Sequence, residues 1–271
     1  MTLSFTLLSF AGILYLVAFA LHFTAFLGVN EGTNRWALVL VRIGFLIHTF
    51  FFFVMPMGAA VSFGSVMAFF SWSLAFVYLV LLAKVQSESF GLILAPLLTL
   101  LIGGGLAGFG GAEIPLPTPL NPYFILHLGT AFFAYASFTL SFAASVLYLA
   151  QYRELKRKRG GTFYHRLPSL EALEGLIYQP MVWGVFLLLT AIAVGFLWAK
   201  SAFGTYWLGE PKTLTTMGIA AFYLVLIYFH FVRSSRGKRW VVLSLVAFGL
   251  VFFNFFGMSL LGRGVHPLTG G

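Results

Sequence analysis

The chain contains no cysteine and no aspartate among its 271 residues. Without cysteine it forms no disulfide, holds no metal through thiolates and carries out no thiol–disulfide exchange by itself. Its acidic groups are seven glutamates, and only 8% of its residues are charged, whereas a soluble domain has roughly a quarter. Few side chains remain that could do chemistry, and six histidines dominate them.

The shortage of charge is matched by an excess of apolar residues. The chain is 60% hydrophobic and 18% aromatic, with a mean hydropathy of +0.97. Because so little polar surface cannot coat a water-facing globule, we expect lipid to be the main solvent. The fold class predicted is all-α, a polytopic membrane helix bundle that forms a single domain over residues 1–271. A spanning helix needs about 20 apolar residues, which places eight spans near 3–27, 36–55, 63–83, 90–110, 122–150, 180–199, 213–232 and 240–261.

The net charge of +9 indicates orientation and anionic lipid rather than a nucleic-acid partner. Most basic residues fall in loops that an eight-span topology places on one side, which the positive-inside rule makes cytoplasmic. Both termini are then outside, as expected for a multi-pass protein of a prokaryotic plasma membrane. Residues 1–23 show no basic n-region and no cleavage site, so they are expected to remain as the first helix. The cytoplasmic set is Arg35, Lys84, Arg153, Lys156, Arg157, Lys158, Arg159, Arg166, Arg233, Arg236, Lys238 and Arg239, and the outer set is Lys200, Lys212 and Arg263.

The segment 153–177 predicts a basic cytoplasmic loop that includes a short amphipathic helix. Leu167, Leu170, Leu173 and Leu176 recur at helical spacing over 162–177, with glutamates opposite, a pattern typical of a helix lying at the membrane interface. The loop could dock a cytoplasmic partner, or it could only anchor the topology and bind lipid.

Four histidines fall at two depths of this topology. His22 and His230 lie near the inner ends of their spans, whereas His127 and His266 lie near the outer face. Because two imidazoles can ligate the iron of one porphyrin from opposite faces, each depth could hold one heme. Intramembrane ionisable groups usually face the bundle interior and mark function, although a lone histidine can equally be a hydrogen-bonded packing residue.

Three other polar residues have more ordinary interpretations. His48 is nearer the outer side, beside a run of phenylalanines, and favours a packing role. His165 lies in the basic loop and favours a plain interfacial role. Arg42 lies well inside a span, where it can snorkel to the inner headgroups or meet a heme propionate, and we favour snorkelling.

Several motifs resemble those of the CcsA-type cytochrome c assembly family over spans three to eight. The run from Leu126 and His127 through Tyr135 to Ser141 is similar to a family helix that begins with a ligand histidine. The segment around Trp72 is similar to another family helix, and 256–266, which ends at His266, is similar to the family's C-terminal ending.

The external segment 200–212 resembles the family's tryptophan-rich heme-binding segment in degenerate form. The family pattern is Trp-Gly-x-Tyr-Trp-x-Trp-Asp-Pro-Lys, and the chain has Phe-Gly-Thr-Tyr-Trp-Leu-Gly-Glu-Pro-Lys over 203–212. Phe203, Gly209 and Glu210 therefore replace two tryptophans and the aspartate. This loss argues against full cytochrome c heme lyase activity, and we predict no independent catalytic activity.

The resemblance implies a heme b cofactor and a set of residues for it. It implies that His127 and His266 ligate heme iron at the outer face, beside an aromatic shelf of Phe203, Tyr206 and Trp207. It implies that His230 ligates a second, intramembrane heme whose other ligand normally comes from a partner or fused segment. From its depth, His22 could fill that place. Lys212, with other basic residues, could pair with propionates.

Three functions remain open at the level of sequence. The first is heme binding and translocation for cytochrome c assembly, with heme, the bilayer and an assembly protein as partners. The second is a HemX-type regulator of heme biosynthesis acting on the level of glutamyl-tRNA reductase, because residues 140–152 and the Leu-Pro-x-Leu-Glu-x-Leu run resemble the HemX branch most. The third, a secondary transporter of another solute, is disfavoured because no inverted repeat or intramembrane acid is found. No P-loop is present for ATP hydrolysis.

Overall fold

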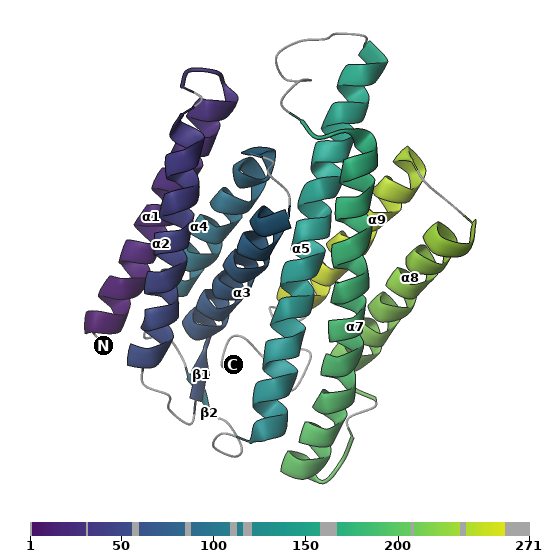
Figure 1. Cartoon of the computed structure of the whole chain (residues 1–271). Coiled ribbons are helices and arrows are strands. Elements are labelled where there is room, and N and C mark those ends of the chain that lie inside the picture. Colours follow the sequence, from purple (N-terminus) through teal and green to yellow (C-terminus); the bar gives the residue numbers. More distant parts are fainter. Residues whose placement is uncertain are drawn as a thin grey trace.

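The computed structural model describes residues 2–30, 32–55, 60–84, 88–108, 113–115, 121–157, 167–206, 209–233 and 237–257. In these ranges the fold is a bundle of long helices, as Figure 1 shows. The α-helices are α1 (Thr2–Phe26), α2 (Thr33–Val54), α3 (Phe63–Lys84), α4 (Gly91–Ala107), α5 (Pro122–Arg157), α7 (Leu170–Phe203), α8 (Pro211–Arg233) and α9 (Lys238–Phe252). The short elements are η1 (Glu88–Phe90), the π-helical turn η2 (Phe253–Gly257), β1 (Ala60–Ser62) and β2 (Glu113–Pro115).

The predicted helical membrane bundle is confirmed. Seven of the described helices are long and apolar enough to cross a membrane, and α4 is a shorter apolar helix of 17 residues. At about 1.5 Å per residue α4 is roughly 26 Å long, just short of a hydrocarbon core of about 30 Å. The two short strands were not predicted. They pair antiparallel, with Val61 opposite Ile114, and so tie the segment after α2 to the one after α4.

The helices form two groups that meet along α3 and α5 (Figure 1). α1, α2, α3 and α4 make the N-terminal group, and α5, α7, α8 and α9 make the C-terminal group. α5 is central, with 72% of its apolar stretch buried, compared with 22% for α8. At the seam Phe69 and Phe70 of α3 pack on Phe132 of α5, and Phe255 of η2 packs there too.

α5 and α7 are longer than a bilayer requires and pack together along their length (Figure 1). With 36 and 34 residues, they extend for roughly 50 Å. Asn121 begins α5 by accepting the Tyr123 N–H at 2.9 Å, and Ser169 begins α7 by accepting from Ala172, both of which are standard N-terminal caps. α7 ends at Gly204, whose φ of +74° is a left-handed helix stop.

The structure differs from the expected loop with its own amphipathic helix over 153–177. α5 continues through Arg157, and α7 begins at Leu170 and runs on without a break. Leu173 and Ile177 are buried in the bundle core instead of lying on a membrane surface. Their leucine spacing therefore reflects the buried stripe of a longer helix, while residues 158–166 lie outside the described ranges.

Pro180 interrupts the hydrogen-bond ladder in the middle of α7. Its ring nitrogen has no N–H to donate to the carbonyl of Leu176, four residues earlier. Ser141 of α5 donates to the neighbouring carbonyl of Ile177 at 2.9 Å. This hydrogen bond holds α7 against α5 one residue away from the freed carbonyl.

Candidate functional site

His127, in the second turn of α5, is anchored to the backbone of α7. Its Nδ1 lies 2.8 Å from the carbonyl oxygen of Ala191. A carbonyl can only accept, so Nδ1 carries the proton and Nε2 keeps its lone pair. The ring packs against Gly195, where an added Cβ would come within 2.8 Å of Nδ1. The glycine therefore provides the space in which the imidazole sits.

Aromatic rings surround His127 on the α7 side. Trp198 stacks on it with ring centroids 6.0 Å apart and planes 17° apart. Trp198 is itself buried and packs on Phe124 of α5 and on Phe203, which ends α7. Ala191, Gly195 and Trp198 follow one another at helical spacing, so one stripe of α7 provides the carbonyl, the space and the indole.

The described residues of 200–206 and 209–212 bring cations and aromatic rings to the end of the bundle that holds this histidine. Lys200 donates to the carbonyl of Gly204 at 2.9 Å, and its Nζ lies 5.3 Å from the centre of the Tyr206 ring. Lys212, in the first turn of α8, interacts electrostatically with both His127 and Glu210. Phe203 and Tyr206 are exposed. Trp207 and His266, which the sequence also predicts for this site, lie outside the described residues.

The donor set at His127 fits heme iron. Metal-ligating histidines usually donate their other ring N–H to a carbonyl or carboxylate, which fixes the tautomer and orients the ring, and His127 does so through Ala191. In the described part of the chain no three His, Cys, Asp or Glu side chains gather to hold a bare metal ion. A porphyrin supplies four ligands of its own and needs only one or two axial groups.

His230 lies between two aromatic rings at the other end of the bundle. Its ring centroid is 4.4 Å from that of Tyr178 on α7 and 4.4 Å from that of Trp240 on α9. The Trp240 indole is fixed by donating to the carbonyl of Leu226 on α8 at 3.2 Å. Because the rings cover the faces of the imidazole, a metal would approach at its edge, where the nitrogens lie.

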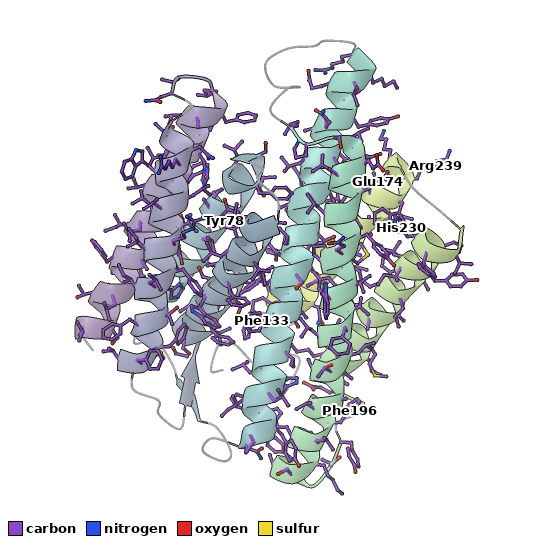
Figure 2. All side chains as sticks on the ribbon, viewed as in Figure 1. Tyr78, Phe133, Glu174, Phe196, His230 and Arg239 are labelled. Carbon is purple, nitrogen blue, oxygen red and sulfur yellow. The ribbon has the colours of Figure 1, made fainter. Side chains whose placement is uncertain are left out.

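His22 is buried in the N-terminal group with both of its ring nitrogens engaged. Nδ1 lies 2.5 Å from the Asn34 side-chain oxygen, and Nε2 lies 3.4 Å from the Tyr78 hydroxyl. Gly91 of α4 packs directly on the ring, where a Cβ would come within 2.4 Å. Figure 2 shows Tyr78 and His230 on opposite sides of α5. The structure therefore does not bring His22 and His230 together, although both lie toward the same end.

The remaining polar residues are placed as follows. His48 is fully buried among Tyr15, Phe51 and Phe52, with the Ala68 backbone as a polar neighbour. Arg42 is exposed on α2, on the outside of the bundle, which agrees with snorkelling. His165 lies outside the described residues.

Sequence reasoning missed the aromatic residues that pack on His127 and His230 in the C-terminal helix group. Trp198, Tyr178 and Trp240 were not singled out, nor was Gly195. The helical spacing of Ala191, Gly195 and Trp198 was a signal that could have pointed to Trp198. Tyr178 and Trp240 sit beside basic or amphipathic stretches, which drew attention to membrane contact instead of to packing.

Taken together, the fold and the site define a multi-span membrane protein with an imidazole of fixed tautomer at one end. Residues 61–266 match the model of the family described as cytochrome C assembly protein. The chain belongs to this family.

Curated relatives carry two names. The chain is 35% identical over 138 residues to Protein HemX of Brevibacillus brevis, covering 50% of each chain, and 29% identical over 139 residues to Protein HemX of Bacillus subtilis (strain 168). It thus spans about half the length of these relatives. It is 25% identical over 244 residues to the cytochrome c biogenesis protein CcsA of Porphyra purpurea, covering 73% of this chain and 74% of that one.

Proposed function

We propose that this chain binds heme b in a prokaryotic plasma membrane and moves it toward the outer face for cytochrome c assembly. The single observation that carries the proposal is the anchored tautomer of His127, whose Nδ1 is tied to the Ala191 carbonyl and whose Nε2 is left to coordinate. Membership in the cytochrome c assembly family supports heme as the cargo.

The chemistry of heme matches the residues around His127. Heme has a flat apolar ring, two propionate carboxylates and an iron that accepts axial imidazoles. Phe203 packs on the Trp198 ring that stacks on His127, and Phe203 and Tyr206 are both exposed and offer aromatic surface to the porphyrin. The ammonium groups of Lys200 and Lys212 at the same end supply the charge that carboxylates require. We assign His266 as the second axial ligand, following the family resemblance.

A second heme position is proposed at His230, near the opposite end of the bundle. In Figure 2, His230 of α8 and Phe196 of α7, the neighbour of Gly195, lie at different levels of the bundle. Heme bound first at His230 and later at His127 would have moved across the membrane. Because both nitrogens of His22 are engaged, we assign the other ligand of His230 to a partner chain. Covalent attachment of heme is not assigned to this chain, since segment 203–212 lacks two of the family's tryptophans.

The test is an absorption spectrum of the purified protein in detergent, as isolated and after addition of hemin. We expect a Soret band with low-spin features for the wild type. His127→Ala and His266→Ala should each reduce the outer component, and His230→Ala should remove a separate component. A protein that shows no Soret band after reconstitution would refute the proposal. A spectrum unchanged by His127→Ala would refute the outer site alone.

A HemX-type regulatory role is a second candidate, favoured by the two relatives of that name. Here heme occupancy would be signalled to a cytoplasmic partner through the basic end of α5, where Arg153, Lys156 and Arg157 are exposed. Since 153–157 belong to α5 and 170–177 to α7, substitution is a cleaner test than deletion. If this role holds, replacing the three basic residues by Gln changes cellular glutamyl-tRNA reductase abundance without changing the heme spectrum. An unchanged abundance would exclude the role for this surface.

A further inference from the structure

Glu174 contacts the start of α9 one helical turn away from the two rings that flank His230. Its Oε1 accepts the backbone N–H of Gly237 at 2.9 Å, at the residue that precedes α9. Tyr148 of α5 shares a side-chain hydrogen bond with the same carboxylate. The carboxylate thus joins α5, α7 and the start of α9. Figure 2 shows Glu174, Arg239 and His230 gathered at this end.

The contact is in register with the rings that hold His230. Tyr178 follows Glu174 by four residues on α7, and Trp240 follows Gly237 by three on α9. At these spacings the side chains lie on the same face of a helix, one turn apart. The Glu174–Gly237 pair therefore forms one layer, and the Tyr178–His230–Trp240 stack forms the next.

The start of α9 depends on this contact for its position. Gly237 has φ +88° and ψ −171°, a backbone conformation essentially restricted to glycine. As the N-cap of α9, Gly237 has no side chain that could cap the helix. Glu174 of α7 supplies an acceptor there by binding the Gly237 N–H. A negative carboxylate is also favoured at a helix N-terminus. Trp240 lies in the first turn that follows, and its indole covers one face of His230.

We propose that Glu174 is a positioning residue for His230. By fixing Gly237 it sets where α9 begins, and through Trp240 it sets the plane in which the imidazole presents its nitrogens. The link to heme rests on the proposed function, whereas the orientation of the ring does not. A neutral glutamine keeps the accepting oxygen, so the hydrogen bond matters more than the charge.

The primary test is NMR of the heme-free protein with isotope-labelled histidine in detergent. His230→Ala identifies the His230 resonances, which the flanking Tyr178 and Trp240 rings should shift upfield. Glu174→Ala should abolish that shift, and Glu174→Gln should retain it. Gly237→Ala, which strains the same contact from the other side, should act like Glu174→Ala. Glu171→Ala is the matched control, since Glu171 is exposed three residues earlier on α7.

The outcomes separate this inference from the proposed function. His230 resonances that are unchanged in Glu174→Ala would overturn the inference, whether or not heme binds. A folded Glu174→Ala protein that has lost the shift, with Glu174→Gln restoring it, supports the inference. In the heme-loaded protein the component removed by His230→Ala should also be lost in Glu174→Ala. A heme spectrum that lacks any His230-dependent component would contradict only the proposed function.

Discussion

His22 and His127 are both largely enclosed histidines on membrane-spanning helices, yet their surroundings differ in kind. His22 has a polar side chain at each nitrogen, Asn34 on one and Tyr78 on the other. His127 has a backbone carbonyl at one nitrogen only, with a glycine beside the ring and an indole stacked on it. The first arrangement uses both nitrogens of the imidazole within the chain, and the second leaves a lone pair on Nε2.

The difference separates a histidine whose two nitrogens are both used within the chain from one that keeps a lone pair on Nε2. A backbone carbonyl selects one tautomer and does not compete for the second nitrogen. Two side-chain partners use both nitrogens and tie helices together, as α1, α2 and α3 are tied at His22. Substitutions in the two regions should therefore separate stability from heme binding.

Gly91→Ala should give the largest loss of stability. The added Cβ would lie 2.4 Å from the buried His22 ring, so the tightly packed α1–α4 contact must open, at a cost of about 3 kcal/mol. Thermal unfolding in detergent, followed by circular dichroism, would measure the fall in Tm. Gly103→Ala on the same helix has open space around its Cβ and should keep or raise Tm. Equal effects of the two would show that the His22 contact is not tight.

His22→Ala should destabilise the protein by about 2 kcal/mol, because it leaves the buried Asn34 and Tyr78 polar groups without this partner. The heme spectrum of the protein that remains folded should equal that of the wild type. Unfolding curves and spectra of one preparation check both halves of this expectation. A selective loss of a heme component at unchanged Tm would show that His22 is a heme ligand. It would contradict the packing role assigned to His22.

Gly195→Ala should weaken heme binding at the outer site about tenfold, or about 1.4 kcal/mol, with little change in Tm. The new Cβ would push on His127 Nδ1 and disturb its hydrogen bond to Ala191. Titration with hemin, read at the Soret band, gives the affinity. Gly175→Ala, on the same helix and with no atom within 4 Å of its Cβ, is the control. Unaltered affinity in Gly195→Ala would mean that the pocket does not hold the ring.

Lys212→Gln should have the smallest effect, lowering heme affinity about threefold, or roughly 0.7 kcal/mol. The loss should shrink as salt is raised, since partly exposed charges are screened. Lys238→Gln at the opposite end should leave the outer-site affinity unchanged. A loss of affinity that is independent of salt would argue against a charge–propionate contact.

The sequence predicted the helices well because each is a long apolar run ended by turn residues. It also predicts a depth for each histidine, because depth follows from position within a span. It could not give the partners of each histidine, since these depend on which helices touch. His22 and His230 belong to separate helix groups, and Figure 2 shows His230 and Tyr78, the neighbour of His22, on opposite sides of α5. The Trp198 stack and the Glu174 contact require the same knowledge of neighbouring helices, which no single span contains.

Pro180 divides α7 into two arms with different tasks. The arm before it carries Glu174 and Tyr178 beside His230, and the arm after it carries Ala191, Gly195 and Trp198 beside His127. A bend at the missing backbone hydrogen bond would change the angle between the arms and leave the contacts within each arm intact. Under the proposed function, a change of angle at Pro180 would move the two heme positions relative to each other without altering the contacts at either one.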